Sequence, residues 1–216
     1  MKYIPYSVYC GQENMDIDAE ILDKAISDNE QDAIFRLYGW KPACVSLGRN
    51  QQDSFLDVKL LSDYKIDVVR RLTGGRALLH DNEITYSFVC PVSYLENGEH
   101  VVSSYKEISQ ILIDKFKNIG IDLDFGNSKP VKTGFDYCML VSTGADLCYQ
   151  NKKLIGSAQC RKNGYILQHG SILYDYDREL LEKIFGEEVS TEEITCIKEI
   201  NPEITKEDII KLLSQS

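Results

Sequence analysis

The sequence predicts an α+β fold, in which a mixed or antiparallel β-sheet forms the core and helices flank it. Segments with the composition of strands follow one another directly at 33–47, 66–91 and 145–174. Segments with apolar residues at helical spacing precede, separate and follow these runs, instead of alternating with single strands. This order is typical of the α+β class.

The first half of the chain supplies one helix and most of the first strands. Apolar residues on one stripe, including Met15 and Leu22, predict the first helix, and Trp40-Lys41-Pro42 predicts a turn between two strands. The elements expected here are a helix at 14–29, strands at 33–39 and 43–47, a short helix at 57–64, and strands at 66–71, 76–80 and 84–91.

The second half is expected to contain the longest helix, at 101–119, which ends at Gly120. Its apolar stripe runs from Val101 to Phe116. Residues 121–144 are mixed in character and are expected to be rich in loops. The remaining elements are strands at 145–150, 153–160 and 164–174, joined by hairpin turns, and helices at 178–185 and 205–214, the last one capped by Thr205.

Length and composition fit one domain over residues 1–216, with a short helical segment at about 200–216. Hydrophobic residues make up 43% of the chain and charged residues 27%, which is ordinary for a globular protein. A chain of 216 residues can bury a core without disulfides or a structural metal. Pro202 is the expected boundary of the terminal segment, and no linker, repeat or low-complexity stretch divides the rest.

The charge balance and the lack of targeting signals limit the partners. Acidic residues outnumber basic ones by 34 to 24, so the net charge is −10. Nucleic acids and anionic membranes need a positive face, so neither is an expected partner, although a local basic pocket is compatible with this balance. No apolar run of ~18 residues could span a bilayer, and Met1–Pro5 does not begin a signal peptide. We therefore expect a cytoplasmic protein.

Seven cysteines are scattered at positions 10, 44, 90, 138, 148, 160 and 196. No two of them form a C-x-x-C pair, which argues against a zinc knuckle or a thioredoxin-like site. A disulfide framework is also unexpected in a chain of this length. We therefore expect no metal and reduced thiols, one of which is free to serve as a nucleophile.

A glycine-rich turn carries the most distinctive local pattern. Thr73-Gly74-Gly75 lies between two predicted strands, with Arg71 before it and His80 after it. Paired glycines let a ligand approach the backbone, and their N–H groups can hold an anion or a carbonyl oxygen. The pattern matches neither the Walker phosphate loop nor the dinucleotide fingerprint. By itself it is more typical of a plain tight turn with exposed arginines.

The run from Arg70 to Ser87 resembles the signature of the biotin/lipoate protein ligase superfamily. Ser46–Arg49 resembles the upstream strand pair of that superfamily, and Lys153–Arg161 with Leu167–Ile172 resembles its downstream hairpin. These motifs occur in the expected order over most of the chain, which is far more specific than one turn. The resemblance is greatest to the branch that holds lipoate–protein ligase A and the cysteine-dependent octanoyltransferases, and it implies a single catalytic domain.

The resemblance implies a pocket for a medium-length acyl chain, between the glycine turn and the strand that carries Lys153. By resemblance Lys153 is catalytic, because an ammonium group stabilises negative charge that develops on an acyl oxygen. The residues that the resemblance places at the acyl group are Arg71, Thr73, Gly74, Gly75, His80, Gly156, Ser157 and Ala158.

Two reactions on a lipoyl-domain lysine are compatible with the resemblance. An octanoyltransferase takes an octanoyl group from acyl carrier protein through an acyl-cysteine and needs no cofactor. A lipoate–protein ligase activates lipoate with ATP and Mg²⁺ and needs no protein nucleophile. In either case the acceptors are lipoyl-domain proteins, such as the glycine-cleavage H protein or a 2-oxoacid dehydrogenase E2. A family member that binds lipoyl proteins without modifying them is the third alternative.

Cys138 favours the transferase. The segment Cys138–Leu147 resembles the one that carries the nucleophile in cysteine-dependent octanoyltransferases, and Cys138 precedes Lys153 by fifteen residues, as the resemblance leads us to expect. A nearby ammonium group would supply thiolate near neutral pH, and a thiolate is a good nucleophile. The chain also ends without the accessory domain that is usual in ligase A. We therefore predict Cys138 and Lys153 as the catalytic residues.

Overall fold

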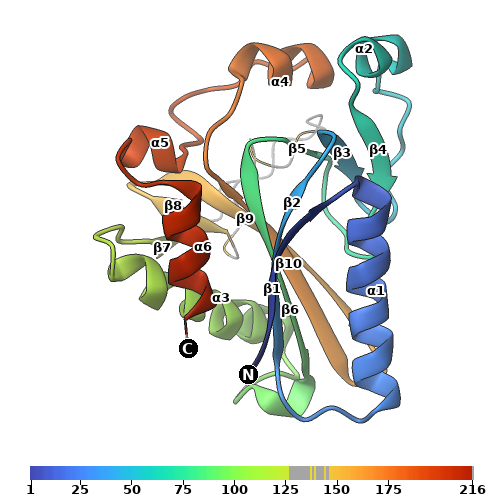
Figure 1. Ribbon diagram of the computed structural model, residues 1–216, viewed down its shortest axis with the longest axis vertical. Helices are drawn as coiled ribbons and strands as arrows, with labels where there is room; N and C mark the ends of the chain where they lie inside the picture. Colours follow the sequence, from blue (N-terminus) through green and yellow to red (C-terminus); the bar gives the residue numbers. More distant parts are fainter. Residues whose placement is uncertain (127–136, 138, 140–143, 145, 216) are drawn as a thin grey trace.

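The computed structural model describes residues 1–126, 137, 139, 144 and 146–215 (Figure 1). Its strands are β1 (Lys2–Tyr9), β2 (Ile34–Trp40), β3 (Cys44–Leu47), β4 (Asp67–Arg70), β5 (Leu78–His80), β6 (Glu83–Pro91), β7 (Asp124–Phe125), β8 (Leu147–Tyr149), β9 (Lys152–Lys162) and β10 (Tyr165–Leu173). Its helices are α1 (Gly11–Ser27), α2 (Val58–Asp63), the 3₁₀ helix η1 (Val92–Tyr94), α3 (Val101–Lys117), α4 (Arg178–Phe185), α5 (Ile197–Ile200) and α6 (Lys206–Ser214).

Two sheets form the centre of the fold. The larger sheet has seven strands in the order β1-β2-β6-β10-β9-β8-β7, and the smaller has three in the order β4-β3-β5. Only β1 with β2 and β3 with β4 are parallel among the described pairs of strands. The predicted α+β class with a mixed, mostly antiparallel sheet is confirmed, whereas the division into two sheets was not predicted.

Two elements at the start of the chain differ from the prediction. No strand was predicted before residue 10, where the structure has β1. Pro5 lacks the N–H group that a central strand needs. β1 lies at the edge of the large sheet, where a proline is tolerated, and its register with β2 shifts after Ile4. α1 begins at Gly11 rather than at residue 14, because Cys10 and Glu13 form a capping box that lacks the usual Ser, Thr or Asp cap.

α1 and α3 cover opposite faces of the large sheet (Figure 1). Phe88 packs in the main core with α3, and its neighbour Val89 packs on the other face with Leu22 of α1, because successive side chains of a strand point to opposite sides. The predicted apolar stripe of α3 is wrong at its first turn, where Val101 is 53% exposed. The predicted cap of the last helix is confirmed, since the Thr205 hydroxyl accepts from the N–H of Asp208 at 3.1 Å.

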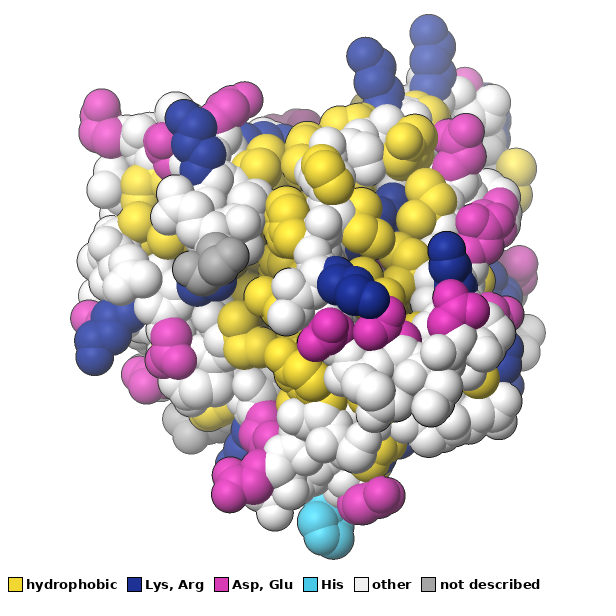
Figure 2. Space-filling view, turned by 60° about the horizontal axis from the view of Figure 1, so that its bottom comes forward, with side chains coloured by type: hydrophobic (Ala, Val, Ile, Leu, Met, Phe, Trp, Pro, Cys, Tyr) yellow, Lys and Arg dark blue, Asp and Glu magenta, His cyan; other side chains and the backbone are white. Residues whose placement is uncertain are grey.

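The lower face of the molecule mixes charged and apolar groups (Figure 2). Hydrophobic side chains gather in a band across the middle of this face, and acidic and basic side chains surround the band. Within the described part of the chain, no helix combines the length and the hydropathy that crossing a membrane requires.

Candidate functional site

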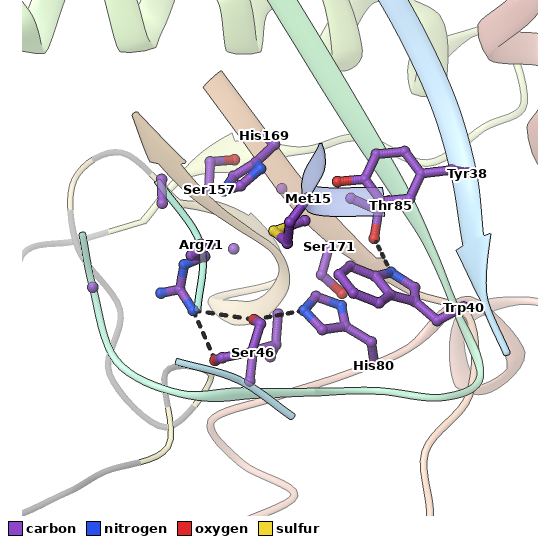
Figure 3. A pocket seen from close by; sticks show the side chains of 15 residues that line it. Met15, Tyr38, Trp40, Ser46, Arg71, His80, Thr85, Ser157, His169 and Ser171 are labelled. Atoms are coloured by element: carbon purple, nitrogen blue, oxygen red, sulfur yellow. Dashed lines mark hydrogen bonds between the residues drawn. The ribbon is translucent and has the colours of Figure 1, made fainter. Parts of the chain in front are cut away.

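A cavity lies where α1, the large sheet and the small sheet meet (Figure 3). Met15, Tyr38, Trp40 and Leu78 give it apolar walls, and Figure 3 shows the Met15 side chain pointing into it from α1. Its other lining residues are Ser46, Arg71, Gly75, His80, Thr85, Gly156, Ser157, Ala158, His169, Gly170 and Ser171. Apolar walls with a few convergent polar groups are typical of small-ligand sites.

The structure brings most of the predicted acyl-binding residues together. Six of the eight line the cavity, namely Arg71, Gly75, His80, Gly156, Ser157 and Ala158. Thr73 and Gly74 are not among the lining residues, and both instead accept hydrogen bonds from Arg71, at 3.1 and 2.8 Å. They therefore hold the Arg71 side chain in place without lining the cavity themselves. Whether the six residues bind an acyl group stays a prediction.

Arg71 follows β4, and only 7% of its surface is exposed. Its Nη1 donates to the carbonyl and hydroxyl oxygens of Ser46 at 2.9 and 3.1 Å, and its Nη2 donates to the carbonyls of Gly74 and Arg76 at 2.8 and 2.7 Å. The guanidinium group thus fixes both sides of the glycine turn to β3. A plain turn with exposed arginines is excluded, because this arginine is buried and engaged by the turn.

The first chain of hydrogen bonds leads from Arg71 through Ser46 to His80. Ser46 Oγ and His80 Nε2 are 2.7 Å apart, and His80 Nδ1 is 3.0 Å from a carboxylate oxygen of Glu83 (Figure 3 shows the Ser46 contact). A carboxylate can only accept, so Nδ1 carries the proton and Nε2 accepts from the Ser46 hydroxyl. Burial outweighs the nearby carboxylate of Glu83 and lowers the pKa of His80, which favours this neutral form.

A second, similar chain leads from Arg71 through Thr73 to His169. Arg71 Nε donates to Thr73 Oγ1, which is 2.7 Å from His169 Nε2, and His169 Nδ1 lies 3.3 Å from Asp18. Each histidine is therefore held between a hydroxyl that Arg71 orients and a buried carboxylate. The two rings have fixed orientations at the cavity wall.

Asp18 connects this second chain to the core. Arg36 donates to it at 2.7 Å and Tyr38 at 2.9 Å, and all three side chains are buried. Burial alone would raise the pKa of Asp18, but His169 and Arg36 outweigh it and hold the pKa below its usual value. The sequence reasoning missed Asp18 and Glu83. The available signal for Asp18 was its place on the apolar stripe of the first helix, where a carboxylate needs a partner.

Trp40 packs against the same histidine that Ser46 orients. Its indole ring stacks on the His80 ring with centroids 3.9 Å apart and planes 15° apart. Its Nε1 donates to the Thr85 hydroxyl at 2.8 Å, and that hydroxyl in turn donates to Glu83. The His80 ring is stacked on Trp40, and both of its nitrogens are hydrogen-bonded. This side of the cavity is therefore preorganised.

The two glycines of the turn play different parts. Gly75 has φ +92°, which residues with a side chain rarely adopt, whereas Gly74 has open space around it. Gly48 is equally constrained, because a Cβ there would lie 1.9 Å from the carbonyl oxygen of Gly75. The turn therefore depends on Gly48 and Gly75 and tolerates a methyl group at Gly74.

Lys153 lies in β9, is 1% exposed, and pairs with Asp146 at 3.0 Å. A Cβ on Gly156 would meet Lys153 Cε at 3.0 Å and Nζ at 3.4 Å, and Met139 Sδ at 2.9 Å. Gly156 lines the cavity, so the ammonium group adjoins this end of it. A plain hairpin lysine would be exposed.

Cys138, the predicted nucleophile, lies outside the described residues. Its chain neighbours are described: Tyr137 forms a bridge with Ala77 and stacks on Phe185 with centroids 4.6 Å apart. Met139 Sδ lies 2.9 Å from the place where a Cβ of Gly156 would be. In the part of the chain that the structure describes, no group of acidic, histidine and cysteine residues has the arrangement of a metal site.

A second, basic groove adjoins the cavity at Arg71, which lines both. Arg49, Arg70 and Lys162 also line this groove. Arg70 is fixed by backbone carbonyl oxygens, whereas Lys162 is neutralised by Asp23 at 2.6 Å. Positive charge is thus concentrated beside the cavity of a protein whose net charge is −10.

We expect Gly48→Ala and Gly75→Ala to lower the free energy of unfolding by about 1–3 kcal/mol, because each forces strain on the turn. Gly74→Ala is the matched control and should change it by less than about 0.5 kcal/mol. Chemical denaturation of the three variants measures the difference. Equal effects at positions 74 and 75 would contradict the assignment.

The lowered pKa of His80 predicts a pH dependence of stability. The unfolded chain protonates this histidine below about pH 6.5 while the folded protein keeps it neutral, so stability falls as the pH drops below that value. We expect His80→Gln to flatten the decline of the unfolding temperature between about pH 7 and 5. His100→Gln, at an exposed position before α3, should leave the decline unchanged. A slope that is identical in all three proteins would refute this.

Comparison with known proteins identifies the family of the chain. Residues 10–216 match the family described as lipoyl protein ligase A/B catalytic domain. Octanoyltransferase LipM of Staphylococcus aureus is 37% identical over 180 residues, which cover 80% of this chain and 65% of that protein. LipM of Kyrpidia tusciae is 40% identical over 177 residues, which cover 78% and 64%. The chain thus spans slightly less than two thirds of the length of these relatives.

Solved structures share the fold at low identity. A lipoate-protein ligase A bound with ATP has a TM-score of 0.76 and 20% identity, with 98% of this chain and 81% of that one covered. A putative lipoate protein ligase from T. acidophilum with bound lipoic acid has a TM-score of 0.74 and 19% identity, with the same coverage. The likeness in fold and the match along nearly the whole chain lead to one conclusion: the chain belongs to the lipoyl protein ligase A/B catalytic domain family.

Proposed function

We propose that the protein is an octanoyltransferase of protein lipoylation, which moves an octanoyl group from acyl carrier protein to a lysine of a lipoyl domain. The cavity is the observation that carries this proposal. Its apolar walls suit a hydrocarbon chain, and the buried cations Arg71 and Lys153 adjoin it. The relatives that bear the name octanoyltransferase LipM support the same activity.

The proposed reaction has two steps and needs neither nucleotide nor metal. The Cys138 thiolate attacks the carbonyl carbon of the octanoyl thioester, the bond to the carrier thiol breaks, and that thiol leaves with a proton. The ε-amine of the target lysine then attacks the acyl-cysteine, the amide bond forms, the amine gives up a proton, and the Cys138 thiol is released. In both steps Lys153 stabilises the negative charge on the carbonyl oxygen.

The choice of Cys138 is also supported by the raised pKa of four of the other six thiols. Burial raises the pKa of Cys44 and of Cys90 to about 12 and that of Cys196 to about 11, so these thiols stay protonated. Burial also raises the pKa of Cys160. Of the chain neighbours of Cys138, Tyr137 bridges Ala77, which precedes the cavity residue Leu78, and Met139 lies beside the cavity residue Gly156.

The buried pair of Lys153 and Asp146 suits the proposed electrostatic role. An isolated ammonium group would be costly at 1% exposure, and the carboxylate at 3.0 Å offsets that cost. Asp146 thereby keeps a positive charge next to Gly156, where the acyl carbonyl is proposed to lie. The proposed partners are acyl carrier protein and lipoyl-domain proteins, in the cytoplasm.

An ATP-dependent lipoate–protein ligase is the second candidate, because the solved structure with a TM-score of 0.76 is a ligase bound with ATP. That reaction would proceed without a protein nucleophile. Replacing Cys138 therefore separates the two functions.

Intact-mass measurement after mixing with octanoyl-acyl carrier protein tests the transferase. We expect one octanoyl group that hydroxylamine removes, and none on Cys138→Ala. Cys160→Ala is the matched control, because this half-buried thiol of β9 should be dispensable and the adduct should persist. No adduct on the wild-type protein, or an adduct on Cys138→Ala, would refute the acyl-cysteine. Release of pyrophosphate with lipoate and ATP that is unaffected by Cys138→Ala would establish the ligase instead.

A further inference from the structure

One polar group that lines the cavity has no role in the hydrogen-bond chains described above. Ser171 lies in β10, is 1% exposed, and has a hydroxyl without a hydrogen-bond partner among the described residues. A buried donor without a partner is costly, and native proteins contain few of them. A ligand in the cavity can supply the missing hydrogen-bond partner.

Two neighbours of Ser171 already use their polar groups for other hydrogen bonds. Thr85, opposite it on β6, is occupied by Trp40 and Glu83. His80, which lines the same cavity, uses both ring nitrogens for Ser46 and Glu83. The Oε2 atom of Glu83 is also buried without a partner among the described residues, and it does not bond to Ser171. Because Ser171 lines the cavity, a ligand there can accept a hydrogen bond from its hydroxyl.

The other neighbour places Ser171 at the same end of the cavity as Lys153. Ser171 is directly opposite Gly156 on β9, and residues opposite each other in such a pair have Cα atoms about 4.5–5.5 Å apart. Gly156 has no side chain, and Lys153 Nζ lies 3.4 Å from where its Cβ would be. The hydroxyl and the ammonium group therefore both lie near Gly156, which lines the cavity and where a Cβ would come within 3.0 Å of Lys153 Cε.

We propose that Ser171 is a catalytic residue that donates a hydrogen bond from Oγ to the carbonyl oxygen of the acyl substrate, next to Lys153. The bond strengthens when that oxygen becomes negative in the tetrahedral intermediate, so it lowers the barrier rather than merely binding substrate. The ligand class is an acyl group with its carbonyl oxygen at the part of the cavity that Gly156 lines. This role rests on the proposed acyl transfer and specifies which groups bind the oxyanion.

The substitution Ser171→Ala distinguishes a catalytic role of the hydroxyl from a purely structural one. The substitution removes a hydroxyl without a protein partner, so the unfolding temperature of the free protein should stay the same or rise. The rate of acyl-enzyme formation should fall by about 100-fold, which is the usual loss for one oxyanion donor. A residue that merely stabilised the fold would show the opposite pair of effects.

Ser87 provides a matched control within the same sheet. Its hydroxyl is also buried and also without a partner among the described residues, but it stands opposite His169 and does not line the cavity. Ser87→Ala should therefore change the unfolding temperature as Ser171→Ala does and leave the rate of acyl-enzyme formation unchanged.

The experiment compares wild type, Ser171→Ala and Ser87→Ala by thermal unfolding, by the rate of acyl-enzyme formation, and by stabilisation with octanoate. A rate for Ser171→Ala within about threefold of wild type, or a clear drop in its unfolding temperature relative to Ser87→Ala, would overturn the proposal. If the wild-type protein forms no adduct, the proposed acyl transfer is refuted. The stabilisation by octanoate then tests whether Ser171 binds the acyl group. Equal stabilisation of wild type and Ser171→Ala by octanoate would then overturn its role, and weaker stabilisation of the variant would support it.

Discussion

The buried guanidinium group of Arg71 is the interaction on which the site depends. A charge that loses its water must be compensated by hydrogen bonds, and the carbonyls of Ser46, Gly74 and Arg76 provide them. These carbonyls belong to β3 and to the turn after β4, so the same contacts join two segments of the small sheet. Removing Arg71 would therefore free the turn and leave several buried acceptors without a donor.

The two histidines extend this order across the cavity. Ser46 and Thr73 are each oriented by Arg71, and each holds one histidine that a buried carboxylate holds from the other side. Glu83 belongs to the large sheet and Asp18 to α1, so the chains of hydrogen bonds connect all three units around the cavity. Because networks of this kind are costly when only partly satisfied, they favour a single arrangement.

The polar wall and the apolar wall serve different ends of one ligand. Met15, Tyr38 and Trp40 offer surface that hydrocarbon can cover, and Lys153 and Ser171 border the end where a carbonyl group would be stabilised. The acidic surface of the protein contributes little here, because the relevant cations are buried or confined to one groove. Local charge therefore differs in sign from net charge where the proposed chemistry takes place.

The sequence by itself determined the α+β class, most helices and strands, and the family, because these follow from local periodicity and from short ordered motifs. It also indicated Arg71, His80 and Lys153, which lie within those motifs. Only the tertiary structure decided how they are held. Asp18 meets His169 across 151 residues of chain. Ser171 is buried in the cavity wall with a hydroxyl that has no partner among the described residues. Hydrogen bonds between distant segments depend on sheet register and helix packing, and no pattern of neighbouring residues records them.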